Sequence, residues 1–240
     1  MIPKIIHYCW FGNNKLTSQA KKCLKSWKKF CPDYTIIEWN ESNFDINCNA
    51  YVKKAYEEKK YAFVSDVARL HAITTIGGIY FDTDYELKKP LSSFLDKSAF
   101  LGWESKTILG TAILACEKGH PFFTKFLSEY DTAIFEKVGN IYLTNTVRLT
   151  MFALPLGLKQ DNSPQLISSV EIFPTEYFYP KDAESGIIKK SPNTYGIHHF
   201  SVSYISFGSR LRIKIYRLLH KLFGKNFAKK LYSLFGRNNT

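Results

Sequence analysis

The sequence predicts an α/β domain built on an open, mainly parallel sheet with helices on both faces. Short apolar runs that suit strands alternate with longer segments that suit helices along most of the chain. The 240 residues are 45% hydrophobic and 16% aromatic, which favours a folded core over disorder. No uninterrupted apolar run approaches the ~18 residues of a spanning helix. We expect one catalytic-type domain at residues 1–205 and a separate tail at residues 206–240.

The elements follow from turn and capping residues taken in order. The apolar start of the chain, Met1 to Asn14, is interrupted by His7 and predicts a buried first strand rather than a signal peptide. Thr17 suits a helix N-cap, Pro32 ends that helix, and Pro121 suits the first turn of a later one. Strands are expected at residues 4–11, 34–39, 79–82, 99–104, 111–116, 170–173 and 195–200, and helices at residues 17–30, 49–60, 65–76, from 121 onward and 143–152.

One helix and the strand after it carry the strongest pattern. Ser65 is expected to cap a helix that ends at Gly77-Gly78, where glycine tolerates the left-handed conformation of a C-terminal cap. Asp66 and Arg69 are three residues apart, so they share one face of this helix. The alternative is an exposed ion pair beside a solvated turn.

The apolar strand Ile79-Tyr80-Phe81 then ends in Asp82 and Asp84. In an extended chain these two carboxylates point to the same side and can reach one point beyond the strand end. Two carboxylates with few other charges suit a hard divalent cation that keeps open positions for phosphate oxygens. In open α/β sheets ligands bind at the carboxyl ends of strands, which is where this pair falls.

Three segments, residues 2–12, 65–69 and 77–84, resemble glycosyltransferase family 32, the sugar-binding-region glycosyltransferases that contain the DXD motif. Many of these are bacterial capsular polysaccharide enzymes, and the catalytic domains of the clostridial glucosylating toxins are similar in the same segments. The resemblance extends over residues 1–205. It implies a GT-A nucleotide-diphospho-sugar transferase fold and a metal-dependent hexosyltransferase that retains anomeric configuration.

The resemblance also implies a metal site. Asp84 is the expected direct ligand, and Asp82 is expected to reach the metal through water, to bind the ribose, or both. Mn²⁺ is favoured and Mg²⁺ is the alternative, because the ligands are oxygens with one imidazole. That imidazole is expected from His198 or His199, with His198 preferred because neighbouring strand residues face opposite ways. A purely structural histidine pair is the alternative.

Substrate contacts are carried over residue by residue. Asp66 and Arg69 are expected to bind the donor sugar and a phosphate oxygen. The remaining candidates are Trp10 at the nucleotide base, Tyr80 at the ribose or sugar, Asn145 at the sugar or acceptor side, and Tyr204 near the phosphates. The family usually has Ser-Trp where this chain has Ser203-Tyr204. The alternative for Trp10 is a buried core side chain, and the alternative for Asn145 is a surface or capping residue. Glu104 is a spare carboxylate just after a strand.

The charge of the chain is concentrated in its tail. After Glu184 there are eleven basic residues and no acidic one, while the first 184 residues hold the other 22 basic groups and all 21 acidic ones. The net charge of +12 therefore divides into +1 and +11. Apolar residues recur at helical spacing between residues 211 and 235, which predicts basic amphipathic helices that bind an anionic membrane surface through residues 209–237. Packing on the domain is the alternative, and nucleic-acid binding is not expected because no recognisable motif accompanies the charge.

The five cysteines include no Cys-x-x-Cys pair and are odd in number, so we expect reduced, mostly buried thiols. His7 and Cys9 occupy alternate positions of the expected core strand.

From the reduced thiols and the basic tail together, we expect a cytoplasmic protein that is peripheral at the inner face of the cell membrane.

The sequence as a whole predicts transfer of a hexose from a nucleotide sugar, UDP-linked in preference to GDP-linked, to a glycan or lipid-linked oligosaccharide acceptor such as a capsule or exopolysaccharide precursor. The alternative is a membrane-docked nucleotide-sugar-binding protein without turnover. A haloacid-dehalogenase-like phosphatase also has Asp-x-Asp after a strand, but it needs Thr or Val where this chain has Glu86.

Overall fold

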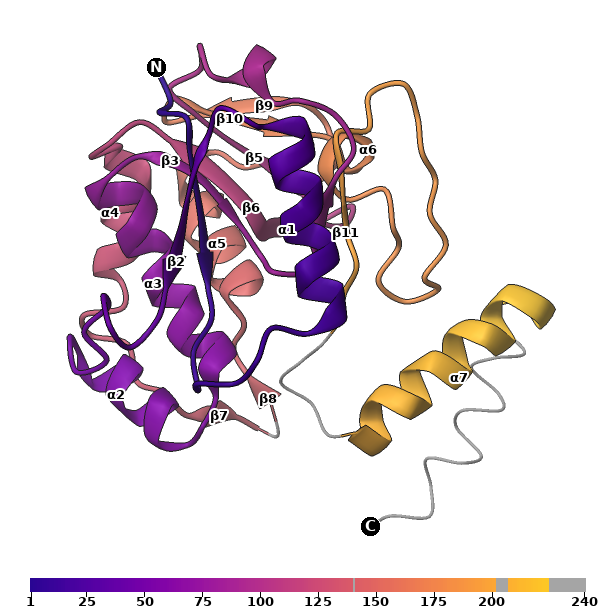
Figure 1. Ribbon diagram of the computed structural model, residues 1–240, viewed down its shortest axis with the longest axis horizontal. Coiled ribbons are helices and arrows are strands. Elements are labelled where there is room, and N and C mark those ends of the chain that lie inside the picture. Colours follow the sequence, from indigo (N-terminus) through magenta and orange to yellow (C-terminus); the bar gives the residue numbers. More distant parts are fainter. Residues whose placement is uncertain (140, 202–206, 225–240) are drawn as a thin grey trace.

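A computed structural model describes residues 1–139, 141–201 and 207–224 of the chain (Figure 1). The strands are β1 (Ile5–Cys9), β2 (Thr35–Trp39), β3 (Gly78–Phe81), β4 (Tyr85–Leu87), β5 (Ala99–Trp103), β6 (Leu109–Cys116), β7 (Lys137–Val138), β8 (Ile141–Tyr142), β9 (Gln165–Ile167), β10 (Val170–Phe173) and β11 (Gly196–His198). The α-helices are α1 (Ser18–Phe30), α2 (Ala50–Glu57), α3 (Tyr61–Thr75), α4 (Pro121–Ser128), α5 (Asn145–Ala153), α6 (Thr175–Phe178) and α7 (Phe207–Phe223), with short 3₁₀ turns at η1 (Ser92–Phe94) and η2 (Leu154–Leu156). Thr17 caps α1 and Pro121 opens α4, as predicted.

The central sheet has seven strands in the order β2-β1-β3-β6-β5-β10-β9. Pairing is parallel for β1 with β2, β1 with β3 and β5 with β10, and antiparallel around β6 and at β9. All strands except β6 and β9 therefore run in one direction, which confirms the predicted mixed, mainly parallel sheet. Because β1, β3 and β5 end at the same edge, Trp10, Asp82 and Glu104 all follow strand ends on that edge.

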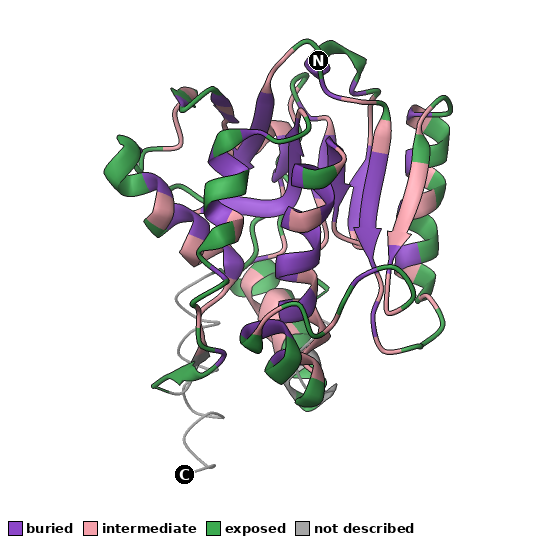
Figure 2. Ribbon diagram, turned by 90° about the vertical axis from the view of Figure 1, so that its left-hand side faces the viewer, coloured by how far each residue is buried: buried purple, intermediate pink, exposed green. Residues whose placement is uncertain are grey.

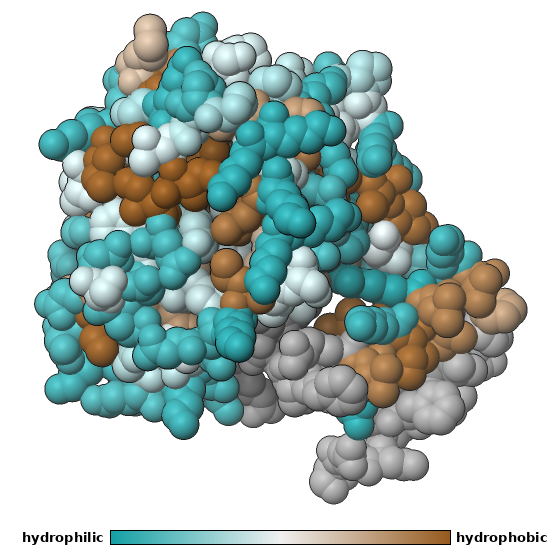
Figure 3. Space-filling view, in the orientation of Figure 1, coloured by the Kyte–Doolittle hydropathy of each residue, from teal (hydrophilic) through white to brown (hydrophobic). Residues whose placement is uncertain are grey.

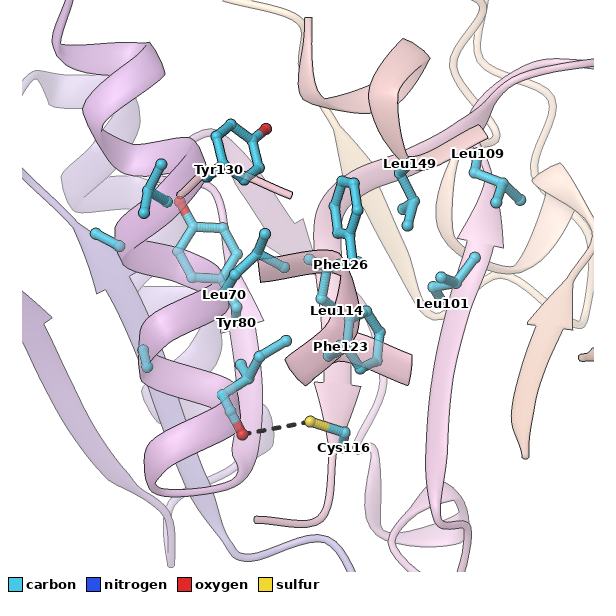
Figure 4. Close-up of a cluster of buried hydrophobic side chains, with 14 of the residues drawn as sticks. Leu70, Tyr80, Leu101, Leu109, Leu114, Cys116, Phe123, Phe126, Tyr130 and Leu149 are labelled. Atoms are coloured by element: carbon cyan, nitrogen blue, oxygen red, sulfur yellow. Dashed lines mark hydrogen bonds between the residues drawn. The ribbon is translucent and has the colours of Figure 1, made fainter. Parts of the chain in front are cut away.

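Two apolar cores enclose this sheet, so its inner strands are buried while the outer helix faces are exposed (Figure 2). One core lies under α2, α3, α4 and α5, where Leu70 and Tyr80 face Phe123 and Phe126 (Figure 4). The Cys116 thiol in this core donates to the Ile73 carbonyl at 3.3 Å. The other core is built around Trp27 of α1. The strands are nearly all apolar because they are covered on both faces.

The predicted start of α3 was wrong. Ser65 lies one turn inside the helix, where its hydroxyl donates to the Tyr61 carbonyl at 2.9 Å instead of capping a free N–H. The helix begins at Tyr61 because apolar contacts of the first turn, including the buried Phe63, outweigh the missing cap. Its end agrees with the prediction, since Gly77 has φ +80° and leads directly into β3.

A small second sheet was not predicted in full. β4 follows the turn after β3 and pairs antiparallel with β11, with Tyr85 opposite His198. α1 holds β4 in place, because the Trp27 indole donates to the Tyr85 carbonyl at 2.7 Å and Ser26 Oγ accepts from the Leu87 amide at 3.0 Å. This arrangement carries a late strand to the Asp82–Asp84 turn.

The predicted basic amphipathic helix is present as α7, which lies beside the main body (Figure 1). The second predicted tail helix, near residues 227–235, lies outside the described residues, as does Tyr204. Within the described ranges, no helix is long and apolar enough to cross a membrane. All five cysteines are free thiols, and only Cys48 is exposed. The buried positions of His7 and Cys9 agree with the predicted core strand.

Candidate active site

Asp82 and Asp84 flank a tight turn rather than an extended segment. The Tyr85 amide donates to the Asp82 carbonyl at 2.9 Å, so the chain reverses between β3 and β4. The two carboxylates converge, as predicted. The turn brings them together, whereas the prediction had relied on the alternation of side chains along an extended strand. A turn aims both side chains beyond the sheet edge while leaving them partly exposed, at 25% for Asp82 and 16% for Asp84.

Asp82 is held from the side of α3. Arg69 Nη2 lies 3.2 Å from Asp82 Oδ1 and 3.0 Å from Asp66 Oδ1, and Arg69 Nη1 donates to the Thr111 carbonyl at 2.8 Å. Tyr80 also donates to Asp82 Oδ1, at 2.9 Å, and its ring lies under the Arg69 guanidinium. Arg69 and Asp66 are both buried, so the alternative of an exposed ion pair is wrong.

Asp84 is held from the side of β11. His198 Nε2 lies 3.2 Å from Asp84 Oδ1 and 4.0 Å from Asp82 Oδ2. The Ser201 amide donates to Asp84 Oδ2 at 2.7 Å. Asp82, Asp84 and His198 each offer one ligand atom, and these atoms lie within 4.8 Å of one another. Two carboxylate oxygens and one imidazole nitrogen at this spacing fit a divalent cation such as Mn²⁺ or Mg²⁺.

Of the two candidate histidines, only His198 meets the carboxylate pair. His199 points the other way, and its Nε2 pairs with Glu86 Oε2 at 2.8 Å. Lys88 contacts the other oxygen of Glu86 at 2.6 Å. His199 is therefore part of a separate polar group beside β4.

Glu104 stands on the far side of the His198 ring. Its Oε2 lies 3.8 Å from His198 Nδ1, which is buried and has no hydrogen-bond partner among the described residues. A ligating histidine usually directs its second nitrogen to a carboxylate or carbonyl, which fixes the ring. The unpartnered Nδ1 facing Glu104 fits that arrangement, so the donor set and its surroundings suit a metal.

The electrostatics of the site follow from burial and these contacts. Burial lowers the pKa of His198, but Asp84, Glu104 and Asp82 outweigh it and raise the pKa to about 9. Burial raises the pKa of Asp84, but His198 and the Ser201 N–H reverse the shift and hold that pKa low. Burial raises the pKa of Asp66 to about 7 despite the Arg69 charge. The pKa of Glu104 is also raised, chiefly by burial.

The other predicted contact residues differ in their exposure and in their position relative to the site. Trp10 is partly exposed at the end of β1, where its indole donates to the Asn14 carbonyl at 2.5 Å. Tyr80 is 1% exposed, so it supports Asp82 and Arg69 from below rather than facing open space. Asn145 is also buried; its amide donates to the Asp66 carbonyl at 3.5 Å, and Tyr130 donates to its oxygen. Asn145 begins α5 behind the site, and Thr144 is the cap, so the surface and capping alternatives were wrong.

Several contributors were not predicted from sequence. The Ser201 amide and the Thr111 carbonyl act through the backbone, which carries no side-chain signal. Tyr179, whose ring lies edge-on to His198, comes from the C-terminal end of the short helix α6.

The fold is of the GT-A type, and the turn with the paired carboxylates lies at the carboxyl edge of its sheet. The structure is similar to a solved one titled PaToxG Glycosyltransferase, with a TM-score of 0.52 and 20% identity over 64% of this chain and 69% of that one. The family described as "Glycosyltransferase sugar-binding region containing DXD motif" matches residues 17–101. The match confirms the resemblance stated above, although it spans less of the chain than the expected residues 1–205.

Curated relatives agree on the glycosyltransferase class. A mannosyl phosphorylinositol ceramide synthase from Saccharomyces cerevisiae is 30% identical over 135 residues, which are 53% of this chain and 35% of that protein. The human lactosylceramide 4-alpha-galactosyltransferase is 28% identical over 135 residues, 55% of this chain and 36% of that protein. The chain thus aligns with about a third of the length of these two relatives. The aligned third is the part for which the likeness is established.

Proposed function

We propose that the protein is a metal-dependent, retaining glycosyltransferase that moves a hexose from a nucleotide sugar, UDP-linked in preference to GDP-linked, to a glycan acceptor. The observation that carries the proposal is the cluster of Asp82, Asp84 and His198 at the carboxyl edge of the sheet, beside the buried Arg69. The carboxylate pair and Arg69 lie inside the matched sugar-binding region. The fold and the relatives support the same reaction class.

Asp84 and His198 would hold the divalent cation, with Asp82 contributing directly or through water. When bound, such a cation neutralises the charge that develops on a departing nucleotide diphosphate. Glu104 would accept from His198 Nδ1–H and fix the imidazole for that task. Mn²⁺ is the favoured ion because the set combines oxygens with one imidazole.

Arg69 and Asp66 would bind the donor on the α3 side. The Arg69 guanidinium is fixed by Asp66, Asp82 and the Thr111 carbonyl, so a planar donor group is ready for a phosphate or sugar oxygen without reordering. Trp10, which follows the end of β1, would line the base pocket. Among the described residues at this edge, only Glu104 is a further carboxylate that could serve covalent catalysis. This shortage of nucleophiles favours same-face displacement assisted by the leaving phosphate.

The acceptor is proposed to be lipid-linked, such as a capsular or exopolysaccharide precursor at the inner face of a bacterial cell membrane. The names of the relatives include ceramide-based acceptors, which are also sugars or headgroups on a lipid anchor. The concentration of basic charge after Glu184 supports a peripheral location at an anionic surface. The free, mostly buried thiols suit the reducing cytoplasm.

The test is slow donor hydrolysis across a panel of UDP- and GDP-sugars with and without Mn²⁺. Metal-dependent release of a single nucleotide is expected, and it names the donor at the same time. Silence in hydrolysis with nucleotide binding retained in a thermal-shift assay, even after lipid-linked acceptors are added, would favour the alternative of a binding protein without turnover. Loss of both signals would overturn the glycosyltransferase proposal.

A further inference from the structure

Helix α7 presents an apolar stripe to solvent. Leu211, Ile215, Leu218 and Leu222 are 48%, 50%, 57% and 62% exposed. At about 100° per residue these four side chains fall within roughly 60° of one another on the helix. Figure 3 shows the apolar side chains gathered along α7. Single exposed leucines are ordinary, but four in one line over three turns mark a contact surface.

The opposite face of α7 is already occupied. Tyr216 donates to Glu184 at 2.9 Å, and Arg217 Nη2 donates to the Ala183 carbonyl at 2.7 Å. The aliphatic part of Arg217 also lies against Gly186, where an added Cβ would come within 3.1 Å of Arg217 Cδ. These contacts orient the helix, so the apolar stripe faces away from the loop that holds it.

The stripe has basic borders. Arg212 lies on one side and Lys214 and Lys221 lie on the other, at roughly 90° from the stripe's centre by helical geometry. No acidic residue follows Glu184. Two copies that met stripe to stripe would bring these basic borders together, which like-charge repulsion disfavours. Apolar residues between rows of cations instead suit the interface of an anionic bilayer.

The loop that holds α7 carries further exposed apolar and basic residues, and it also contacts the active-site region. Ile187 and Ile188 are 39% and 41% exposed, and two further lysines, Lys189 and Lys190, follow them. At the start of the same loop, Lys181 donates to the His199 carbonyl at 2.6 Å, one residue from His198. The loop therefore joins the support of α7 to the segment that carries His198.

We propose that the exposed stripe of α7, with its basic borders, docks on an anionic lipid bilayer. This inference gives the peripheral location proposed above a defined surface, and it does not depend on turnover. The basic amphipathic pattern predicted membrane binding through residues 209–237; the structure adds which face of α7 is exposed and which face holds the helix to the domain.

The experiment is co-flotation of the full chain with vesicles of phosphatidylcholine alone or mixed with phosphatidylglycerol. The triple variant Leu211→Gln, Leu218→Gln, Leu222→Gln keeps helix-forming residues but removes most of the stripe. Its partition onto mixed vesicles should fall by about 100-fold. Ile134→Gln, Met151→Gln and Leu166→Gln remove three equally exposed apolar residues elsewhere and should leave partition unchanged.

The charge component is tested separately. Lys214→Gln with Lys221→Gln should lower partition by about fivefold per charge and weaken its dependence on salt. Donor hydrolysis in solution should be unchanged in every variant, which separates failure of this proposal from failure of the glycosyltransferase assignment. Equal binding of wild type to neutral and mixed vesicles, or full binding by the triple variant, would overturn the proposal.

Two results would assign the stripe to another occupant. A dimer in solution that the triple variant dissociates, measured by light scattering, would assign it to a second copy. A chain ending at Gly224 that no longer binds vesicles would move the membrane contact to residues 225–240. Either result overturns the proposal for α7, whereas retained preference of the shortened chain for anionic vesicles supports it.

Discussion

Asp82 and Asp84 stand on the same turn but are held in different ways. Asp82 pairs with Arg69, a permanent cation that is itself fixed by Asp66 and a backbone carbonyl. Asp84 pairs with His198, a nitrogen base that can give up its proton and offer a lone pair. The partner of Asp82 on the α3 side is thus a permanent cation, while the partner of Asp84 on the β11 side can exchange a proton for a metal ion.

This difference assigns unequal parts to two residues that look equivalent in sequence. The Arg69 contact occupies one oxygen of Asp82 and leaves the other 4.0 Å from His198. Asp84 directs one oxygen to the histidine and anchors the other on the Ser201 amide. Metal ligation is therefore expected to depend mostly on the β11 side, and donor positioning on the α3 side.

The largest effect that tests the comparison is on Mn²⁺ affinity in single carboxylate variants. Asp84→Asn should weaken Mn²⁺ binding by about 100-fold or more, while Asp82→Asn should weaken it by about tenfold, because Arg69 already engages Asp82. Titration of free Mn²⁺ by electron paramagnetic resonance gives both constants without a turnover assay. A greater loss in Asp82→Asn than in Asp84→Asn would reverse the two roles.

The next effect separates the two histidines. His198→Gln should lower Mn²⁺ affinity by about 10- to 100-fold, because it removes the nitrogen that faces Asp84. His199→Gln should change it by less than about twofold, because His199 is bonded to Glu86. The matched pair is measured by the same titration, with thermal unfolding as a check on folding. Equal losses in the two variants would mean that the β11 register differs in the metal-bound protein.

The fold was largely predictable because its strong patterns are local. Thr17, Pro121 and Gly77 mark element ends by capping and backbone preferences that act within a few residues. Ser65 shows the limit of such signals, since apolar packing of Tyr61 and Phe63 moved the helix start against a good cap. The antiparallel course of β6 was also beyond reach, because only pairing between distant segments sets it.

The site was predictable in residue types but less so in detail. The sequence indicated Asp66, Arg69, Asp82 and Asp84 through their spacing, yet Tyr80 proved to be a buried support and Asn145 lies behind Asp66. The choice between His198 and His199 rests on the register of β11 against β4, which no local rule fixes. Backbone contributors such as the Ser201 amide have no sequence signal at all.

The smallest expected effect is on the melting temperature of the protein when Asp66, on the α3 side, is replaced. Asp66 has a pKa of about 7 in the folded protein against 3.8 ordinarily, mainly because it is buried. The folded state therefore binds the extra proton between these values, and its stability falls as the pH rises through that window. Asp66→Asn removes this loss, so it should raise the melting temperature by a few degrees at pH 8 while having little effect near pH 4. Differential scanning calorimetry measures both.

The control for that prediction is Asp96→Asn, which changes an exposed aspartate and should give the same small difference at both pH values. Loss of stability at pH 8 in Asp66→Asn would mean that the charge of Asp66 stabilises Arg69 more than its burial costs. Gain of stability together with loss of donor binding would show that Asp66 is kept for the substrate at the expense of the fold, as expected for a buried carboxylate that binds a sugar hydroxyl. The contacts of the α3 side would then serve recognition of the donor sugar rather than stability of the fold.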